Sequence, residues 1–178
     1  MLTVGRILLV PLIVWLMLVP RYELALVIFV AAGITDLVDG YLARRFEMKT
    51  RVGAYLDPLA DKALLVSVFV TLGVQGLVEA WLVVLVVSRD IAIVAAVILM
   101  HLAGARVRMT PFFISKLNTA VQILYALFVL ALLAFKGTHT DWIAYAGWPV
   151  AALTIASWAA YLIEWLKAMA AGEDKPSA

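Results

Sequence analysis

Long apolar stretches alternate with short polar connections along most of this chain. Six of them come close to or exceed the roughly 20 residues with which an α-helix crosses a bilayer, and glycine, proline or charged residues separate them. The predicted helices lie at about Thr3–Val19, Glu23–Ala43, Ala54–Leu77, Ala80–Leu102, Pro111–Phe135 and Trp142–Leu166. We therefore expect an all-α integral membrane protein, a bundle of six transmembrane helices in one domain over residues 1–170, with a polar tail over 171–178.

Composition supports this prediction. Of 178 residues, 66% are hydrophobic and 15% are charged, whereas soluble domains are about half apolar and about a quarter charged. The absence of cysteine excludes disulfides, thiolate metal sites and a cysteine nucleophile. We expect no cleavable signal peptide, because the first apolar stretch begins almost at Met1 without a basic lead-in.

Basic residues gather in two of the five connections. They are Arg44, Arg45, Lys49 and Arg51 between the second and third helices, and Arg106 and Arg108 between the fourth and fifth. Short connections rich in lysine and arginine stay on the cytoplasmic side of a membrane. Both connections and both termini are therefore predicted to be cytoplasmic.

Four aspartates lie at the predicted cytoplasmic ends of the second and third helices. Asp36 and Asp39 are spaced i, i+3, and Asp57 and Asp61 are spaced i, i+4, so each pair shares one helix face. A carboxylate beside hydrocarbon is costly, and four together repel one another unless cations bind between them. A divalent-metal site is the simplest physical solution.

Two other interpretations of the four aspartates remain open at this point. The aspartates could pair with the cations of Arg44, Arg45, Lys62 and Arg89 in a purely structural network. A divalent-cation transporter could also hold acids within its spans. It would tend to place them near the bilayer midplane between repeated halves, whereas here they cluster at one face and no repeat is evident.

The whole acidic region reads Asp36-x2-Asp39-Gly40-x2-Ala43-Arg44-x8-Gly53-x3-Asp57-x3-Asp61. It resembles the signature of the CDP-alcohol phosphatidyltransferase family. The resemblance implies a six-span, usually dimeric enzyme of phospholipid synthesis that joins a CDP-activated lipid to an alcohol and releases CMP.

The resemblance also implies roles for these residues. Asp36, Asp39, Asp57 and Asp61 would hold two Mg²⁺ or Mn²⁺ ions, and Asp61 would be the catalytic base for the acceptor hydroxyl. The CDP-lipid would bind beside Gly40, Ala43, Arg44 and Gly53. Carboxylate oxygens are the donors that both metals prefer.

Three further cations are candidates for the phosphate of the acceptor. Arg89 lies in Ser88-Arg89-Asp90, Lys116 lies near the start of the fifth helix, and Arg6 belongs to a first-span pattern that resembles the family's. Arginine and lysine favour phosphate oxygens. The alternative for the first two is a structural Arg89–Asp90 network and a Lys116 side chain that only reaches toward water.

The fifth helix bears on the acceptor alcohol. Its run Ser115-Lys116-Leu117-Asn118-Thr119 has one lysine. Asn118 stands where the similar run of phosphatidylglycerophosphate synthases, which use glycerol 3-phosphate, shows a second lysine. The run is similar to that of mitochondrial-type cardiolipin synthases, which implies CDP-diacylglycerol and phosphatidylglycerol as substrates, with glycerol 3-phosphate as the alternative acceptor. We expect a homodimer in a bacterial inner membrane, in contact with membrane lipid and not with nucleic acid.

Overall fold

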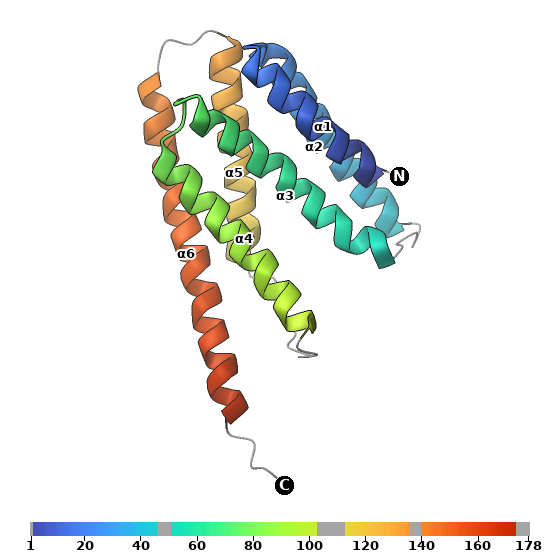
Figure 1. Ribbon diagram of the computed structural model, residues 1–178, viewed down its shortest axis with the longest axis vertical. Helices are drawn as coiled ribbons and strands as arrows, with labels where there is room; N and C mark the ends of the chain where they lie inside the picture. Colours follow the sequence, from blue (N-terminus) through green and yellow to red (C-terminus); the bar gives the residue numbers. More distant parts are fainter. Residues whose placement is uncertain (1, 46–50, 103–112, 136–139, 174–178) are drawn as a thin grey trace.

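Helices make up all the regular structure in the part of the chain that can be described. The computed structural model describes residues 2–45, 51–102, 113–135 and 140–173, and the side chains of 8–35, 38, 62–95, 113–135 and 141–163. The helices are α1 (Leu2–Leu18), α2 (Tyr22–Arg45), α3 (Arg51–Val74), α4 (Ala80–Leu102), α5 (Phe113–Ala134) and α6 (Thr140–Glu173) (Figure 1). The all-α prediction is confirmed and each predicted span coincides with one helix, whereas six membrane crossings remain a prediction.

Two helix ends differ from the predicted ones. The third helix was predicted to reach Leu77 but ends at Val74, because Gly76 has a φ of 70° and its amide donates to Gly73 O at 3.0 Å. The amide of Leu77 donates to Leu72 O at 3.0 Å, which completes a Schellman motif. The sixth helix continues past Leu166 to Glu173, since the intervening residues are mostly good helix formers. The predicted tail at 171–178 therefore begins inside this helix, and 174–178 lie outside the described residues.

The helices pack as a closed ring. Neighbours around it are α1, α2, α5, α6, α4 and α3, which returns to α1, and α3 also contacts α5 across the middle. In Figure 1, α1 and α2 lie on one side of the bundle and α4 and α6 on the other, with α3 and α5 between them. Consecutive helices therefore need not be neighbours, and α5 brings α2 and α6 into one body.

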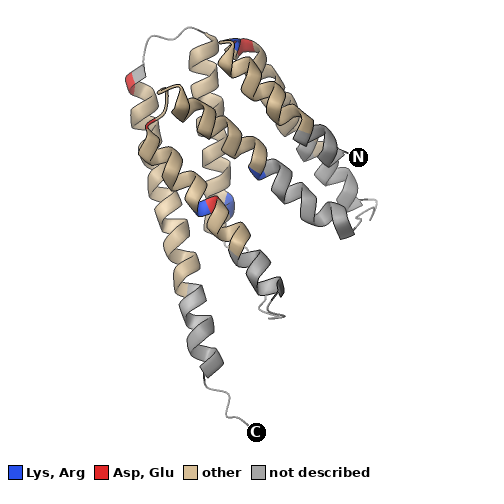
Figure 2. Cartoon of the chain, in the orientation of Figure 1, with Lys and Arg blue, Asp and Glu red and all other residues tan. Residues whose placement is uncertain are grey.

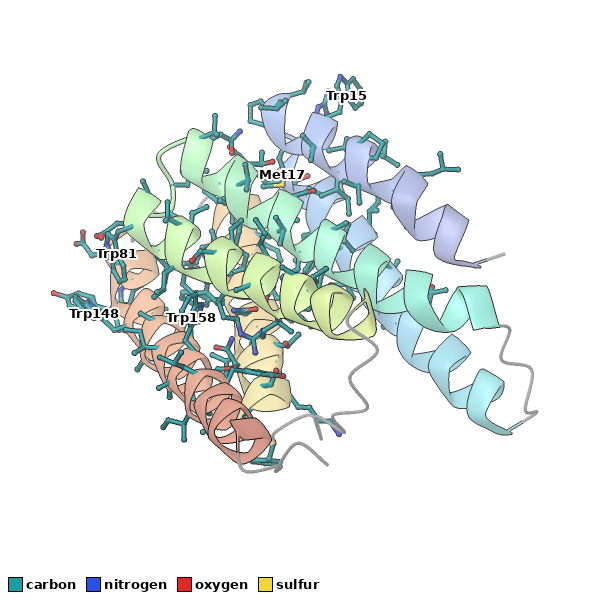
Figure 3. The ribbon with its side chains drawn as sticks, turned by 60° about the horizontal axis from the view of Figure 1, so that its bottom comes forward. Trp15, Met17, Trp81, Trp148 and Trp158 are labelled. Carbon is teal, nitrogen blue, oxygen red and sulfur yellow. The ribbon has the colours of Figure 1, made fainter. Side chains whose placement is uncertain are left out.

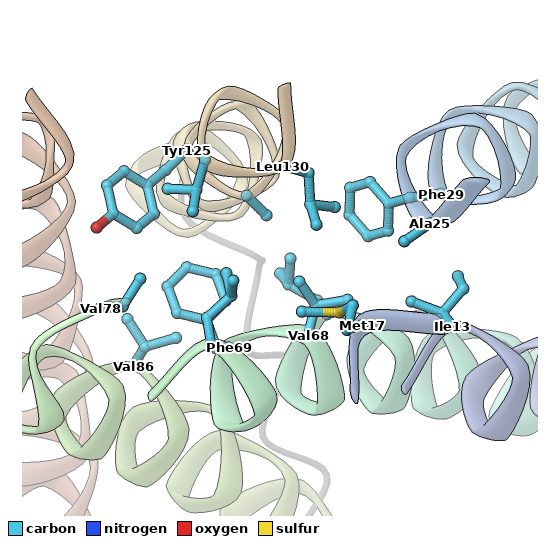
Figure 4. Packing of buried hydrophobic residues seen from close by; sticks show 14 of the residues in the cluster. Ile13, Met17, Ala25, Phe29, Val68, Phe69, Val78, Val86, Tyr125 and Leu130 are labelled. Carbon is cyan, nitrogen blue, oxygen red and sulfur yellow. The ribbon is translucent and has the colours of Figure 1, made fainter. Parts of the chain in front are cut away.

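An apolar core fills the centre of the ring. It includes Ile13 and Met17 of α1, Phe29 of α2, Phe69 of α3 and Leu130 of α5, all buried (Figure 4). The rings of Phe69 and Tyr125 stack with their centroids 5.8 Å apart. Close helix approaches complete the packing, because a Cβ at Gly73 would lie 2.8 Å from Val83 Cγ2.

The outer faces of the bundle carry large apolar side chains. Trp15 is 59% exposed and Trp148 is 64% exposed, and both lie at the periphery with Trp81 (Figure 3). Apolar surface on this scale is suited to lipid or to a partner rather than to water. Within the described ranges, Phe113–Ala134 and Asp141–Ile163 are long and apolar enough to cross a membrane.

Candidate functional site

The four motif aspartates all lie on observed helices. Asp36 and Asp39 belong to α2, and Asp57 and Asp61 belong to α3, so their i, i+3 and i, i+4 spacings are helical spacings. Only residues 46–50 separate the two helices, which keeps Arg45 and Arg51 within about 20 Å of each other at about 3.5 Å per residue. The aspartate side chains lie outside the described set.

The other candidate site residues also lie on observed helices. Gly40, Ala43 and Arg44 belong to α2, Gly53 belongs to α3, and Arg6 belongs to α1. The side chains of these residues lie outside the described set. The predicted roles of these residues stay predictions.

Arg89 is the centre of a buried polar group that the structure does describe. Arg89 is 1% exposed, and its Nη1 donates to Asp90 Oδ1 at 2.6 Å. Nη2 donates to Ser115 Oγ of α5 at 2.6 Å and to Ser157 Oγ of α6 at 2.7 Å. One guanidinium therefore links α4, α5 and α6. Its hydrogen bonds offset part of the cost of burying its charge.

Lys62 extends this group to α3. Its Nζ lies 2.7 Å from Asp90 Oδ1, the same oxygen that accepts from Arg89. The lysine side chain is 24% exposed and that of Asp90 is 3% exposed. Figure 2 shows that charged residues are few along the described helices, and that residues of both signs lie together partway along α4.

A row of polar side chains continues from Arg89 between α5 and α6. Thr154 Oγ1 lies 3.0 Å from Asn118 Oδ1 and 2.7 Å from Val150 O. A hydroxyl has one proton to donate, so the pair is best satisfied when Thr154 donates to the carbonyl and the Asn118 amide is turned to donate to Thr154. We call Arg89, Asp90, Ser115, Asn118, Gln122, Thr154 and Ser157 the polar seam.

Five buried atoms of the polar seam have no hydrogen-bond partner among the residues that the structure describes. They are Arg89 Nε, Asp90 Oδ2, Asn118 Nδ2, Gln122 Nε2 and Gln122 Oε1. Buried polar atoms normally have partners, and each one without a partner costs about 1–3 kcal/mol. Turning the Asn118 amide gives its Nδ2 a partner but leaves its Oδ1 without one, so the seam keeps donors and acceptors that suit water or a ligand that offers both kinds of group.

The structure places Lys116 and Arg89, the two described candidates for binding the phosphate of the acceptor, in different surroundings. Lys116 is an exposed residue near the start of α5, whereas Arg89 is buried with both Nη atoms bonded. The Arg89–Asp90 network that the sequence left open is therefore present. Ser157 and Thr154 were not foreseen as members of the site. Their spacing of i, i+3 within an apolar helix was the available signal.

The donor set fits a divalent cation. Within the described side chains, no three acidic or histidine residues come together, and the motif aspartates are not among them. Lys62 and Arg89, two of the cations in the ion-pair alternative, both bond to Asp90. The four motif carboxylates are oxygen donors of the kind that Mg²⁺ and Mn²⁺ prefer.

Fold and motif together define a class of protein, a helical bundle with apolar outer faces and four acidic residues on two consecutive helices. A family model described as CDP-alcohol phosphatidyltransferase matches residues 1–163. The chain belongs to the CDP-alcohol phosphatidyltransferase family.

Curated relatives fall into two groups by name. The chain is 35% identical over 152 residues to the cardiolipin synthase (CMP-forming) of Homo sapiens, covering 76% of this chain and 50% of that protein. It is 31% identical over 181 aligned residues to a chloroplastic CDP-diacylglycerol–glycerol-3-phosphate 3-phosphatidyltransferase of Oryza sativa, covering 92% and 55%. A Bacillus subtilis protein with the latter activity in its name is 33% identical over 137 residues, covering 68% and 70%. The chain thus spans about half the length of the first two relatives.

Proposed function

We propose that this protein transfers a phosphatidyl group from CDP-diacylglycerol to phosphatidylglycerol and releases CMP, which makes cardiolipin. Family membership supports a transferase over the cation transporter. The observation that favours this acceptor is the surroundings of Asn118. This residue is 0% exposed, and its side chain pairs with Thr154 inside the polar seam.

The argument from Asn118 is electrostatic. In the resemblance drawn above, this position holds a second lysine in enzymes that use glycerol 3-phosphate. A lysine here would bring its ammonium into the seam toward Arg89, whereas asparagine brings no charge. Glycerol 3-phosphate carries nearly two negative charges and phosphatidylglycerol carries one. A site with one cation fewer is better matched to the less charged acceptor.

The motif residues supply the chemistry in this proposal. Bound metal ions would neutralise the oxygens of the pyrophosphate and steady CMP as it leaves. Asp36, Asp39, Asp57 and Asp61 would hold these ions on α2 and α3. Gly40, Ala43 and Gly53 would let the nucleotide approach the helix backbones, and Arg44 would contact the phosphates.

The transfer itself is a displacement at phosphorus. The acceptor hydroxyl oxygen attacks the phosphorus that carries diacylglycerol, and the bond from this phosphorus to the bridging oxygen of CMP breaks. Asp61 takes the hydroxyl proton. Lys116, exposed at the start of α5, would meet the acceptor phosphate together with Arg6, and Arg89 would add positive charge from behind Ser115.

The remaining predictions belong to the same proposal. The six helices would cross the membrane, with the acidic motif on the cytoplasmic side and two copies forming a dimer. A bacterial inner membrane is the proposed location. The apolar outer faces of the bundle and its two long apolar helices support a lipid setting.

Phosphatidylglycerophosphate synthesis is the second candidate. It is supported by the names of the Oryza sativa and Bacillus subtilis relatives, the first of which covers 92% of this chain. In that case glycerol 3-phosphate would be the acceptor at the same site. The reaction would otherwise proceed in the same way.

An acceptor assay separates the two candidates. Purified protein would be given CDP-diacylglycerol and Mg²⁺ or Mn²⁺ with either phosphatidylglycerol or glycerol 3-phosphate, and lipid products would be identified by mass spectrometry. We expect cardiolipin and CMP with phosphatidylglycerol. Product with glycerol 3-phosphate and none with phosphatidylglycerol would establish the second candidate instead.

A further inference from the structure

Asp90 has no role in the reaction proposed above, yet it joins the helix of the acidic motif to the rest of the bundle. We propose that Asp90 is a positioning residue that holds Lys62, and through Lys62 fixes the part of α3 that carries Asp57 and Asp61. This inference rests on the proposed metal-dependent function. It assigns to Asp90 and Lys62 an effect on metal affinity.

The contacts converge on one oxygen. Asp90 Oδ1 accepts from Lys62 Nζ at 2.7 Å and from Arg89 Nη1 at 2.6 Å. The side chains of Arg89 and Asp90, both on α4, are almost fully buried, at 1% and 3% exposed. Without the carboxylate, two cations would face each other in a region of low dielectric and would repel strongly.

The far side of this contact is firmly anchored. Arg89 is bonded to Ser115 of α5 and to Ser157 of α6, so Asp90 presents its oxygen from a framework of three helices. Among the described side chains, Lys62–Asp90 is the one ion pair that joins α3 to another helix. Elsewhere α3 and α4 meet through an apolar contact, the close approach of Gly73 to Val83.

Lys62 directly follows Asp61 and lies five residues after Asp57 on the same helix. A tether at Lys62 therefore limits the rotation and axial shift of the helix turns on which both aspartates are carried. Metal and catalytic groups need to be held to within about 0.5 Å of their working geometry. Loss of the residues that support metal ligands typically lowers metal affinity about 10–100-fold.

The test measures Mn²⁺ binding directly and separately from turnover. Full-length protein in detergent is titrated with Mn²⁺, and free Mn²⁺ is followed by electron paramagnetic resonance. We expect Asp90→Asn to raise the Mn²⁺ dissociation constant about tenfold, and Lys62→Met to raise it by a similar factor. Lys62→Arg, which keeps the charge, should retain most of the affinity.

A double variant distinguishes one shared tether from two separate effects. If Asp90 acts through Lys62, Asp90→Asn with Lys62→Met should bind Mn²⁺ about as well as either single variant. Residues that act as a unit are not additive. Multiplication of the two single effects in the double variant would overturn the proposal.

Tyr125→Phe is the matched control for a purely structural loss. It removes the buried hydrogen bond from Tyr125 Oη to Ile143 O, 3.1 Å long, which joins α5 to the start of α6 and does not involve Lys62. We expect it to lower the thermal midpoint without changing Mn²⁺ affinity. If Tyr125→Phe shifts affinity as much as Asp90→Asn does, Asp90 has only a structural role.

The outcomes also separate this inference from the proposed function. No Mn²⁺ binding by the unmodified protein would remove the metal site itself. Normal binding that Asp57→Asn abolishes, but that Asp90→Asn and Lys62→Met leave unchanged, would overturn the positioning role alone. If Asp90→Asn does not fold, Lys62→Met at its partly exposed position decides the matter in the same way.

Discussion

The same two helices, α5 and α6, meet in two different ways along their length. On one stretch, Val129, Tyr125 and Val150 belong to a packed apolar core. One to two turns away, Asn118, Gln122 and Thr154 belong to the polar seam, in which some buried atoms have no partner among the described residues. The core therefore contributes to stability, whereas the hydrogen bonds of the seam offset only part of the cost of burying its polar groups.

This division suggests where function resides. Polar side chains within a membrane bundle are costly and are usually functional. The seam begins at Ser115, next to Lys116, and is tied through Asp90 to the residue that follows Asp61. Changes in the seam and the motif should therefore affect catalysis more than stability, and changes in the core should do the reverse.

The largest expected effect belongs to the motif. We expect Asp57→Ala to lower CMP release about 1,000-fold, because a metal ion contributes several kcal/mol of transition-state stabilisation. CMP release from CDP-diacylglycerol would be measured at saturating Mg²⁺, with the thermal midpoint as control. Full turnover in this variant would remove Asp57 from the site.

The largest effect on stability should come from the core. Phe69 is 0% exposed and stacks on Tyr125, so Phe69→Ala should lower the free energy of unfolding by about 3–5 kcal/mol. Denaturant unfolding in detergent would measure this loss. The metal concentration for half-maximal activity of the folded fraction should not change. A changed metal requirement would mean that core and site are not separate.

A smaller loss is expected where α3 and α4 come close. A methyl group at Gly73 would lie 2.8 Å from Val83 Cγ2, and overpacking of this kind costs about 1–3 kcal/mol. Gly33→Ala on α2 is the matched control, since among the described residues no atom outside the adjoining helix backbone lies within 4 Å of the new Cβ. Equal thermal midpoints for Gly73→Ala and Gly33→Ala would contradict the packing described here.

The smallest change sharpens the choice of acceptor. Asn118→Lys adds a cation to the seam, where Gln122 Oε1 has no partner among the described residues and can accept from it. We expect the ratio of activity with glycerol 3-phosphate to that with phosphatidylglycerol to rise about tenfold, which is about 1.4 kcal/mol. Asn118→Met, of similar length without charge, should leave this ratio unchanged. The same rise in both variants would show that charge at this position does not select the acceptor.

Much of this architecture was predictable because helix length and apolarity act locally. The runs around Ala80–Leu102 and Phe113–Ala134 closely match observed helices. The end at Val74 was missed because it depends on the left-handed backbone of Gly76, and the start of the loop resembles helix in its apolarity. The acidic motif was readable because its residues are close in sequence.

The polar seam was only partly predictable because it depends on tertiary packing. Arg89 and Asp90 are adjacent in sequence, so their pairing was foreseen as an alternative. Lys62 lies 28 residues from Asp90 and Ser157 lies 68 residues from Arg89. Neither contact follows from the periodicity of a single helix.

The central claim is that the four motif aspartates hold two divalent ions. The most direct measurement is anomalous diffraction from crystals grown with Mn²⁺ and CDP-diacylglycerol. We expect two Mn²⁺ peaks about 4 Å apart, each within bonding distance of carboxylates from both α2 and α3. Carboxylates of Asp36, Asp39, Asp57 and Asp61 too far apart to share an ion, with no peak between them, would contradict the claim.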